Sequence, residues 1–324
     1  MNTASATITP CVASRPHVAA GTGPAFGGVV VPLATPLAAV DSLDVGGLGR
    51  LVEHVIDGGV HGIFVLGTTG EGPSLSHETQ RSLVREVMRQ VGDRVPVFVG
   101  ITDPSFAESV ALADWAAAEG AAAVVAAPPF YFAAAQEALV GWMTELADRV
   151  PLPLLLYHIP EMTKAGFTID SLRALADCPN IVGLKDSSGD MDYFAAAMAV
   201  ARNHRPDWSM LMGTEMLFPR GRALGCHGVV PGGANVCPRV FADMHAALVR
   251  GDGDAIDSLQ AEMQSLGRLY SVGTLPGRVV VGIKAALAEL GICSALAATP
   301  FERLTPDQHR EVRAILATLK ECGA

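Results

Sequence analysis

The sequence is poor in charged residues, and in lysine above all. Charged side chains make up 17 % of its 324 residues, against roughly 25 % in typical soluble domains. The only lysines are Lys164, Lys185, Lys284 and Lys320. Acidic residues outnumber basic ones by 33 to 23, which gives a net charge of −10. Because nucleic acids and anionic membranes bind basic surfaces, this balance argues against both as partners.

Patterns typical of metal sites, membranes and secretion are also missing. The six cysteines form no CxxC pair and no cluster with histidine at zinc-site spacing. We therefore expect no metal, and reduced thiols in a cytoplasmic protein. No apolar run reaches the roughly 18 residues of a membrane span. Residues 1–25 lack the basic and apolar segments of a secretory signal, and their Ala/Thr/Pro/Gly-rich composition predicts a flexible tail.

What the sequence does contain is a series of short apolar runs, each as long as a strand buried on both faces. They are Val29–Leu33, Ile63–Leu66, Val97–Gly100, Ala123–Ala127, Leu154–Tyr157, Ile181–Lys185, Met210–Gly213 and Gly228–Pro231. Amphipathic helical segments fill most of the gaps. The alternation predicts an α/β protein with a (β/α)8 TIM barrel over residues 26–240. An open doubly wound sheet is the alternative, but neither GxGxxG nor GxxxxGK[ST], the phosphate loops of such sheets, occurs.

Helix boundaries can also be predicted from the sequence. Ser76 is placed as the N-cap of a helix that runs to Val91, and Gly120 as the C-cap residue after a helix over Phe106–Glu119. Residues 241–324 are expected to form helices packed on the barrel, over Phe241–Val249, Ala255–Leu269, Val279–Leu290 and Pro306–Leu319.

Lys185 differs from the other lysines because it ends an apolar run. At the carboxyl end of a barrel strand its amine would lie at the mouth, where the active sites of this fold are found. Burial disfavours the ammonium form and leaves more free amine, which is what attack on a ketone to form a Schiff base requires. An ion-paired lysine at a strand end is the structural alternative.

Tyr157 ends the preceding run, so two neighbouring strands would bring Tyr157 and Lys185 together across the mouth. A phenol at that place can relay protons, although a strand tyrosine can also be simply part of the core. A glycine-containing turn, residues 67–71, follows the second run. Its amides and the hydroxyls of Thr68 and Thr69 suit a carboxylate, while an ordinary turn is the alternative.

Four motifs occur together and in one order along the chain. They are Gly67-Thr68-Thr69-Gly70-Glu71, Tyr157-His158-Ile159-Pro160, Gly183-Leu184-Lys185-Asp186-Ser187-Ser188-Gly189-Asp190 and Gly225-Cys226-His227-Gly228-Val229-Val230. With these motifs the sequence resembles the dihydrodipicolinate synthase / N-acetylneuraminate lyase family, the class I pyruvate-type aldolases. The resemblance extends over roughly residues 26–320.

The resemblance implies catalytic roles for particular residues. Lys185 would form the Schiff base with a 2-oxo acid, and Tyr157 would be the proton shuttle. Thr68 and Thr69 would hold the carboxylate of the 2-oxo acid, with Thr69 also linked to Tyr157 in a proton relay. Tyr131 resembles the tyrosine that completes such a relay, often across a subunit contact.

The resemblance also implies how the pocket is lined and how the chain assembles. Gly213 and Val230 match positions that line the pocket near the Schiff base. No metal or organic cofactor is implied, because the lysine itself supplies the electron sink. The family is commonly a dimer of dimers, so we expect a homo-oligomer. The expected binding partner is a small-molecule 2-oxo acid.

The sequence departs from the synthase branch of the family at Met162. That branch has an arginine five positions after the shuttle tyrosine, and the arginine binds the carboxylate of the second substrate. A thioether cannot replace a bidentate guanidinium, although Lys164 offers a single charge nearby. Met162 would instead make the substrate pocket more apolar on this side.

We therefore expect a Schiff-base-forming lyase, an aldolase or dehydratase, that acts on a 2-oxo acid such as pyruvate or a 2-keto-3-deoxy acid. The alternatives are a 4-hydroxy-tetrahydrodipicolinate synthase and a non-catalytic barrel that binds a keto acid. Aldol cleavage and dehydration pass through the same iminium, so the sequence does not separate them.

Three other ionisable residues are expected to be structural. His158 follows Tyr157 and should point away from the barrel axis, because strand side chains alternate. Glu71 lies in the turn with the threonines, where it suits capping of loop amides. Lys284 lies in a predicted C-terminal helix, where a solvated amine is expected.

Overall fold

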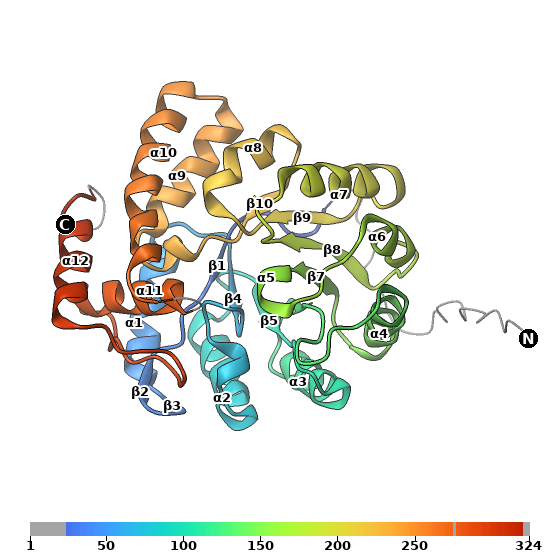
Figure 1. Cartoon of the computed structure of the whole chain (residues 1–324), viewed down its shortest axis with the longest axis horizontal. Coiled ribbons are helices and arrows are strands. Elements are labelled where there is room, and N and C mark those ends of the chain that lie inside the picture. The colour runs from blue at the N-terminus through green and yellow to red at the C-terminus, as the bar shows by residue number, and fades with distance from the viewer. Residues whose placement is uncertain (1–23, 275–276, 320–324) are drawn as a thin grey trace, which may run out of the picture.

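The structure, a computed structural model, describes residues 24–274 and 277–319. Residues 1–23 of the predicted tail lie outside this range. The described chain is built around a closed barrel of parallel strands in the order β1-β10-β9-β8-β7-β6-β5-β4 (Figure 1). The barrel strands are β1 (Gly28–Pro32), β4 (Gly62–Val65), β5 (Val97–Gly100), β6 (Ala123–Ala126), β7 (Leu154–His158), β8 (Ile181–Asp186), β9 (Ser209–Met212) and β10 (Gly228–Val229). The predicted (β/α)8 barrel is confirmed, and every strand begins within one residue of its predicted run.

The barrel strands are apolar because both of their faces are buried. In β1 all five residues are buried. Val29 and Val31 pack outward in the cluster shared with the helices, whereas Val30 packs inward with Phe64 and Leu155. Side chains therefore alternate between two apolar layers, and a polar residue that faces inward at a strand end is held in a largely apolar interior.

Helices surround the barrel. They are α1 (Val45–Asp57), α2 (His77–Val91), α3 (Phe106–Ala118), α4 (Gln136–Arg149), α5 (Pro160–Thr163), α6 (Ile169–Leu175), α7 (Met191–His204), α8 (Phe218–Ala223) and α9 (Pro238–Arg250). A small hairpin of β2 (Leu37–Ala39) and β3 (Ser42–Leu43) precedes α1. The predicted N-cap is confirmed, because the Ser76 hydroxyl accepts a hydrogen bond from the backbone N–H of Thr79.

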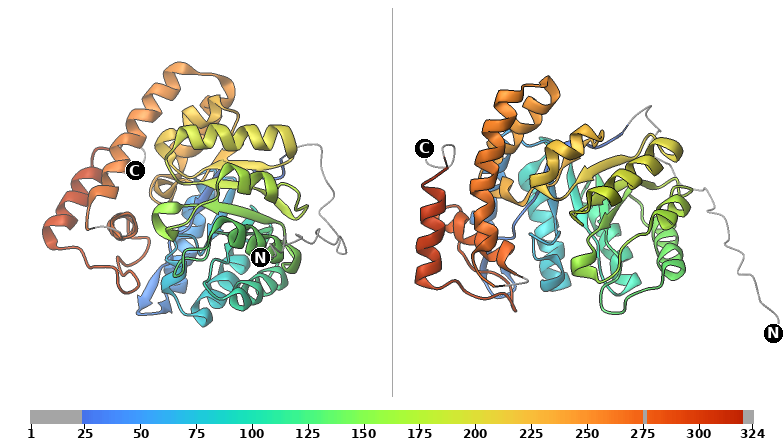
Figure 2. Two further views of the ribbon diagram at one scale, coloured as in Figure 1. Left: turned by 45° about the vertical axis from the view of Figure 1, so that its right-hand side comes forward. Right: turned by 45° about the horizontal axis from the view of Figure 1, so that its top comes forward.

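The C-terminal helices pack against one flank of the barrel, beside the segment that contains β1 and α1 (Figures 1 and 2). They are α10 (Gly253–Gly267), α11 (Arg278–Glu289) and α12 (Pro306–Leu316), with a 3-10 turn η4 (Arg268–Ser271) after α10. Arg50 Nε of α1 donates to the carbonyl of Ile292 at 2.8 Å, and Ser294 Oγ donates to the carbonyl of Leu37 at 2.7 Å. The division proposed after residue 240 falls inside α9, the helix that follows the last barrel strand.

Lys284 is not solvated, so the expectation from the sequence was wrong. The central residues of α11, Val280 to Leu287, are all buried, and Lys284 is 0 % exposed. Its ammonium forms an ion pair with the Glu71 carboxylate, which is equally buried. α11 is sandwiched within the protein rather than lying on its surface, which leaves the amine no route to water.

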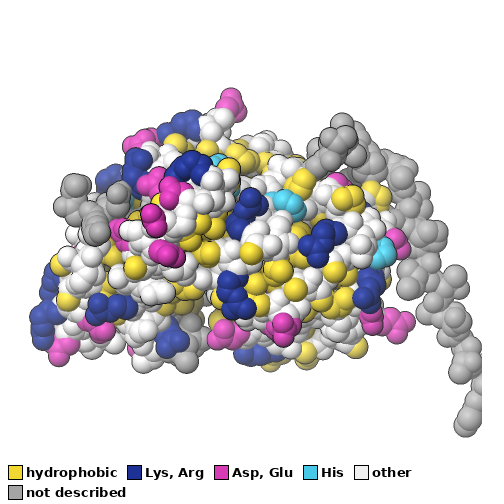
Figure 3. Space-filling model, turned by 90° about the horizontal axis from the view of Figure 1, so that it is seen from above, with side chains coloured by type: hydrophobic (Ala, Val, Ile, Leu, Met, Phe, Trp, Pro, Cys, Tyr) yellow, Lys and Arg dark blue, Asp and Glu magenta, His cyan; other side chains and the backbone are white. Residues whose placement is uncertain are grey.

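The cysteines and the surface complete the description. Cys226 and Cys293 are free and buried, Cys178 is buried with its Sγ 3.6 Å from Thr144 Oγ1, and Cys237 is disulfide-bonded. The expectation of reduced thiols was wrong at Cys237, because its disulfide does not belong to a CxxC pair, the pattern on which the expectation was based. Within the two described ranges, no helix is long and apolar enough to cross a membrane. Basic and acidic side chains are interspersed with apolar ones on the face seen in Figure 3.

Candidate active site

Lys185 and Tyr157 face each other at the carboxyl ends of β8 and β7. The two strands are paired so that Tyr157 lies opposite Lys185. Lys185 Nζ lies 3.8 Å from the centroid of the Tyr157 ring and 4.8 Å from that of Phe64. Lys185 and Tyr157 are each 5 % exposed. The structure thus brings together the two strand-end residues that the sequence placed on adjacent strands.

Strand alternation explains why Tyr157 and not its neighbours points inward. Leu156 packs outward among the helices, while Tyr157 belongs to the inner cluster. His158 points outward again and stacks on Tyr193 of α7, with ring centroids 4.1 Å apart. Burial lowers the pKa of His158 to about 4. His158 is therefore a neutral packing residue outside the barrel, as expected from the alternation.

The electrostatics of the pair suit nucleophilic and acid–base chemistry. Burial lowers the pKa of Lys185 below its ordinary value, and the nearby Tyr157 only partly offsets this effect. Burial opposes ionisation of Tyr157, but Lys185 and the hydrogen bond from Thr68 outweigh it, so the pKa of Tyr157 is also lowered. The arrangement holds an amine that loses its proton more readily than usual beside a phenol that can exchange one.

The turn after β4 supplies a hydroxyl to this pair. Thr68 Oγ1 lies 3.2 Å from the hydroxyl oxygen of Tyr157. The family resemblance implied that Thr69 contacts the Tyr157 hydroxyl, whereas in the structure Thr68 makes this contact. The turn does not keep strand alternation, because Leu66 and Glu71 have φ of +60° and +58°. Thr69 is 8 % exposed in the same turn.

Ser187 is a site residue that the sequence analysis missed. Its side chain contributes to the lowered pKa of the Tyr157 phenol. A Cβ added to Gly213 would lie 1.9 Å from Ser187 Oγ, so glycine is needed there to leave room for the hydroxyl. The available signal was the spacing: Ser187 follows Lys185 by two, so it lies on the same side of the chain as the lysine.

The two expected pocket-lining positions flank this arrangement. Gly213 follows β9 directly, and its N–H donates to the carbonyl of Asp186 at 2.6 Å. Val230 follows β10, is 3 % exposed and packs in the inner cluster with Tyr157 and Leu211. Gly213 thus adjoins the end of β8, which carries Lys185, and Val230 shares the inner cluster with Tyr157.

Tyr131 and Met162 lie on the surface instead. Tyr131 is 79 % exposed and packs edge-on against Phe132, which is 81 % exposed. Met162, in the short helix α5 after β7, is 37 % exposed. Within one chain, therefore, Tyr131 is not buried with Tyr157.

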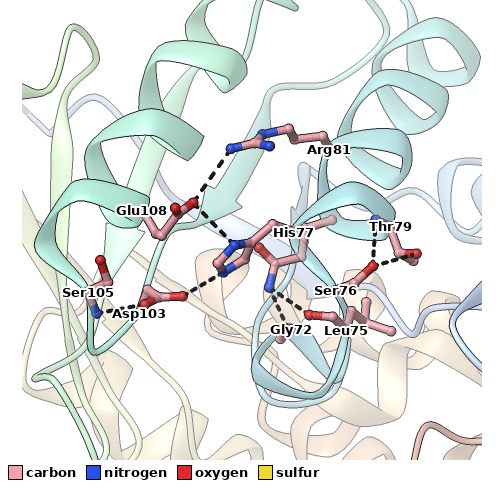
Figure 4. Close-up of polar contacts among 10 residues, drawn as sticks. Gly72, Leu75, Ser76, His77, Thr79, Arg81, Asp103, Ser105 and Glu108 are labelled. Atoms are coloured by element: carbon pink, nitrogen blue, oxygen red, sulfur yellow. Dashed lines mark hydrogen bonds and ion pairs between the residues drawn. The ribbon is translucent and has the colours of Figure 1, made fainter.

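A polar cluster supports the turn from its outer side, between α2 and α3 (Figure 4). His77 Nε2 lies 3.0 Å from Asp103 Oδ2, and its Nδ1 lies 3.2 Å from Glu108 Oε2. Gln80 donates to the carbonyl of Gly72 at 2.9 Å and so fixes the 3-10 turn η1 (Gly72–Ser74) that follows the threonines. Among the described residues, no group of three or more His, Cys, Asp or Glu side chains is arranged to hold a metal ion.

Comparison with known proteins agrees with this geometry. An uncharacterized DapA-like lyase of Halobacterium salinarum is 33 % identical over 303 residues, which cover 93 % of this chain and 97 % of the relative. A 4-hydroxy-tetrahydrodipicolinate synthase of Thiobacillus denitrificans is 34 % identical over 289 residues, 89 % of this chain and 95 % of the relative.

Solved structures show the same fold. Dihydrodipicolinate synthase from Bacteroides thetaiotaomicron has a TM-score of 0.87 and 40 % identity, over 92 % of this chain and 100 % of the other. A prophage protein of E. coli K12, solved in complex with pyruvate, has a TM-score of 0.87 and 27 % identity over the same shares. Residues 25–319 match the dihydrodipicolinate synthetase family, and the chain therefore belongs to that family.

Proposed function

We propose that this enzyme is a class I lyase that binds a 2-oxo acid, such as pyruvate or a 2-keto-3-deoxy acid, as a Schiff base on Lys185. The observation that carries the proposal is the buried contact between Lys185 and Tyr157, with Thr68 on the phenol. The pyruvate complex of the E. coli family member supports a keto acid as the ligand. Relatives named as lyases and synthases support the reaction class.

The reaction begins when the unprotonated amine of Lys185 adds to the keto carbon. The carbonyl oxygen takes up a proton and the nitrogen loses one, giving a carbinolamine, and loss of water then gives the iminium. Tyr157 delivers and removes these protons, with Thr68 as its hydrogen-bond partner. Thr69 and the amides of its turn hold the carboxylate, while Gly213 and Val230 line the pocket. The lysine supplies the electron sink, so no further cofactor is needed for this chemistry.

The iminium can lead to either of two reactions, aldol cleavage or dehydration. In aldol cleavage the hydroxyl on the far side of the breaking carbon–carbon bond gives up its proton to a base and becomes the carbonyl of the released aldehyde, while the electron pair of that bond passes into the iminium and gives an enamine. In dehydration a carbon-bound proton leaves first, and the resulting enamine expels a hydroxyl group that departs as water. Both outcomes fit the residues present.

Met162 bears on the second substrate. A second carboxylate at this position would find a neutral thioether instead of a bidentate cation, and Lys164 nearby donates to the carbonyl of Glu161. Loss of two charge-assisted hydrogen bonds amounts to about 2–4 kcal/mol. We therefore favour an aldolase or dehydratase over a 4-hydroxy-tetrahydrodipicolinate synthase, the function that several relatives are named for.

We further propose a homo-oligomer, a dimer of dimers, in which Tyr131 of one subunit reaches the site of another. Its 79 % exposure within one chain supports a position at a subunit contact. The cytoplasm remains the proposed location. The free thiols of Cys226 and Cys293 fit that compartment, in which a disulfide such as that at Cys237 is uncommon.

Trapping the Schiff base tests the proposal directly. The protein is incubated with pyruvate and borohydride, and the adduct is located by peptide mapping. We expect one adduct on Lys185 that is absent from Lys185→Ala and present in Lys164→Ala, the matched control at an exposed lysine. If neither pyruvate nor larger 2-oxo acids modify Lys185, the Schiff-base proposal is wrong and a non-catalytic keto-acid-binding barrel takes its place.

A further inference from the structure

Glu71 and Lys284 form a deeply buried charge pair apart from Lys185 and Tyr157. Both side chains are 0 % exposed and form an ion pair. Glu71 lies in the turn after β4, and Lys284 lies in α11 of the C-terminal helical layer. The mechanism proposed above uses neither residue, yet the pair joins the turn that carries the threonines to a distant part of the chain.

The pair is completed by backbone groups of the segment after α11. The second carboxylate oxygen of Glu71 accepts a hydrogen bond from the N–H of Ala298 at 2.5 Å. Lys284 Nζ donates to the carbonyl of Leu296 at 2.6 Å. Cys293 is the other titratable group beside Lys284. The carboxylate and the ammonium therefore each have a second partner, and all these contacts clamp residues 296–298 onto the turn.

The same contacts constrain the backbone of the turn. Glu71 has φ of +58°, a conformation that L-residues adopt only when surrounding contacts hold them in it. Its N–H donates to the carbonyl of Thr68 at 3.1 Å. The hydroxyl of Thr35 donates to the carbonyl of Gly70 at 2.6 Å. A change in the position of Glu71 is thereby transmitted to Thr68, whose hydroxyl bonds Tyr157.

Stability alone is a poor reason to bury such a pair. Removing two charges from water has a large desolvation penalty, and apolar side chains of similar volume often stabilise a core as well or better. Burial raises the pKa of Glu71 and lowers that of Lys284, while each charge opposes the shift of the other. A directional contact does what an apolar pair cannot: it fixes the carboxylate, and with it the turn, at one place.

We propose that Glu71 and Lys284 are positioning residues, through which the C-terminal helical layer holds Thr68 in hydrogen-bonding contact with the Tyr157 phenol. The inference rests on the proposed function only in that Tyr157 is taken as the proton shuttle. The structural claim concerns the link between the ion pair and the phenol, and it can be tested without substrate.

The titration of Tyr157 reports on this link. A hydrogen bond to a phenolate favours the charged form, so loss of the Thr68 contact raises the pKa of Tyr157. The groups that face the phenol are Lys185, Thr68 and Ser187. Burial raises the pKa of Tyr193 and of Tyr270, so these two tyrosines ionise at higher pH than Tyr157. The Tyr157 signal is the difference in tyrosinate absorbance between each protein and the same protein with Tyr157→Phe.

We expect Lys284→Met to raise the midpoint of the Tyr157 titration by about one pH unit, and we expect the same shift from Thr68→Val. The double variant Thr68→Val/Lys284→Met should show no further shift, because both changes act through one contact. Glu71→Gln, which keeps an acceptor for the N–H of Ala298, should give a shift in the same direction. It replaces Lys284→Met in the experiment if that variant does not fold.

The control is Leu146→Ala, a buried position in α4 that weakens the protein without contacting the turn. Its Tyr157 midpoint should equal that of the parent. An unchanged midpoint in the folded Lys284→Met or Glu71→Gln protein overturns the inference, and so does a double variant whose shift is the full sum of the two single shifts. Failure of pyruvate to trap on Lys185 would instead count against the proposed function and leave this titration readable.

Discussion

Lys185 loses its proton more easily than a solvated lysine because of what surrounds it. Its Nζ lies over the rings of Tyr157 and Phe64. These faces attract a cation weakly, but they do not replace the water that solvates an ammonium. Burial therefore lowers the pKa of Lys185 and leaves more of the free amine, which is the form that adds to a keto carbon. The reactivity of the site thus follows from placing a lysine at an inward position of a barrel strand.

The pH dependence of adduct formation on Lys185 follows from its lowered pKa. Below that pKa the fraction of free amine rises about tenfold per pH unit, and above it the fraction is constant. With saturating pyruvate and rapid trapping, the rate should therefore increase with pH and level off below the ordinary lysine value of about 10.4.

The same trapping reaction on a free lysine derivative in solution gives the reference curve for a solvated amine. If the rate at Lys185 rises over the same pH range as that of the free lysine derivative, burial does not control the reactivity of the amine.

At the residue scale, the proposed role of Met162 in substrate choice can be tested directly. We expect no condensation of pyruvate with aspartate semialdehyde by the parent protein. Met162→Arg should not create this activity, because the whole acceptor side, and not one guanidinium, must fit the second substrate. A coupled assay of condensation on both proteins, with Lys185→Ala as the blank, measures this. Synthase activity in the parent protein would show that our interpretation of this loop is wrong.

Single residues also mark the limit of prediction from the sequence. Lys185 and Tyr157 could be paired because strand alternation and adjacency fix where they point. Thr68 and Thr69 could not be told apart, since they lie in a turn flanked by residues with positive φ, where no periodicity applies. Ser187 could have been found, because it continues the inward side of β8 by two positions.

At the scale of elements, the strands were predictable and the burial of α11 was not. A strand buried on both faces leaves a local apolar run, and all barrel strands left one. The burial of α11 depends on contacts that are distant in sequence, with the 3-10 turn Gly232–Asn235 after β10 and with Glu71 in the turn after β4. The sequence alone therefore predicted a solvated Lys284, whereas the fold encloses it with Glu71.

The contact between β7 and α7 makes stability depend on pH. His158 is buried there in the neutral form, and its pKa falls from 6.5 to about 4 on folding. Between these values the unfolded chain binds more protons, so the free energy of unfolding contributed by His158 decreases as the pH falls through this window. The full effect is about 3 kcal/mol.

The variant His158→Gln should remove this dependence. Urea unfolding of the parent and the variant at pH 7 and pH 4.5 measures it as the difference in the pH-induced loss of stability. Asp186, opposite His158 on β8, has a pKa raised by burial to about 6 and gives a slope of the opposite sign between 3.8 and 6. The comparison with the parent cancels that contribution. If both proteins lose the same free energy of unfolding between pH 7 and pH 4.5, protonation of His158 does not cause the pH dependence.

At the scale of the whole molecule, the exposed aromatic pair is the feature that one chain leaves unexplained. Tyr131 and Phe132 are 79 % and 81 % exposed, and each contributes apolar surface that a second subunit could cover. The proposed relay needs the hydroxyl of Tyr131 near Tyr157, but within one chain Tyr131 stands on the surface. A partner subunit that supplies this tyrosine would account for both its exposure within one chain and its proposed place beside Tyr157.

Complementation between two inactive chains tests this arrangement. Lys185→Ala lacks the nucleophile and Tyr131→Phe lacks the relay hydroxyl, so each alone should show little lyase activity. If the tyrosine acts across the contact, a mixed dimer contains one complete site, because one chain supplies Lys185 and the other Tyr131. Random reassortment makes half of the dimers mixed, so about a quarter of the parent activity should return on mixing.

The control mixes Lys185→Ala with Phe132→Leu, which changes the neighbouring exposed ring but keeps the Tyr131 hydroxyl. Phe132→Leu should retain most of its activity alone and gain nothing on mixing beyond dilution. Activity in the first mixture that equals the mean of its two components would place Tyr131 in its own subunit's site or outside the relay. Recovery that appears only after the subunits exchange would tie the catalytic hydroxyl to assembly, since the site would then be incomplete in a separated chain.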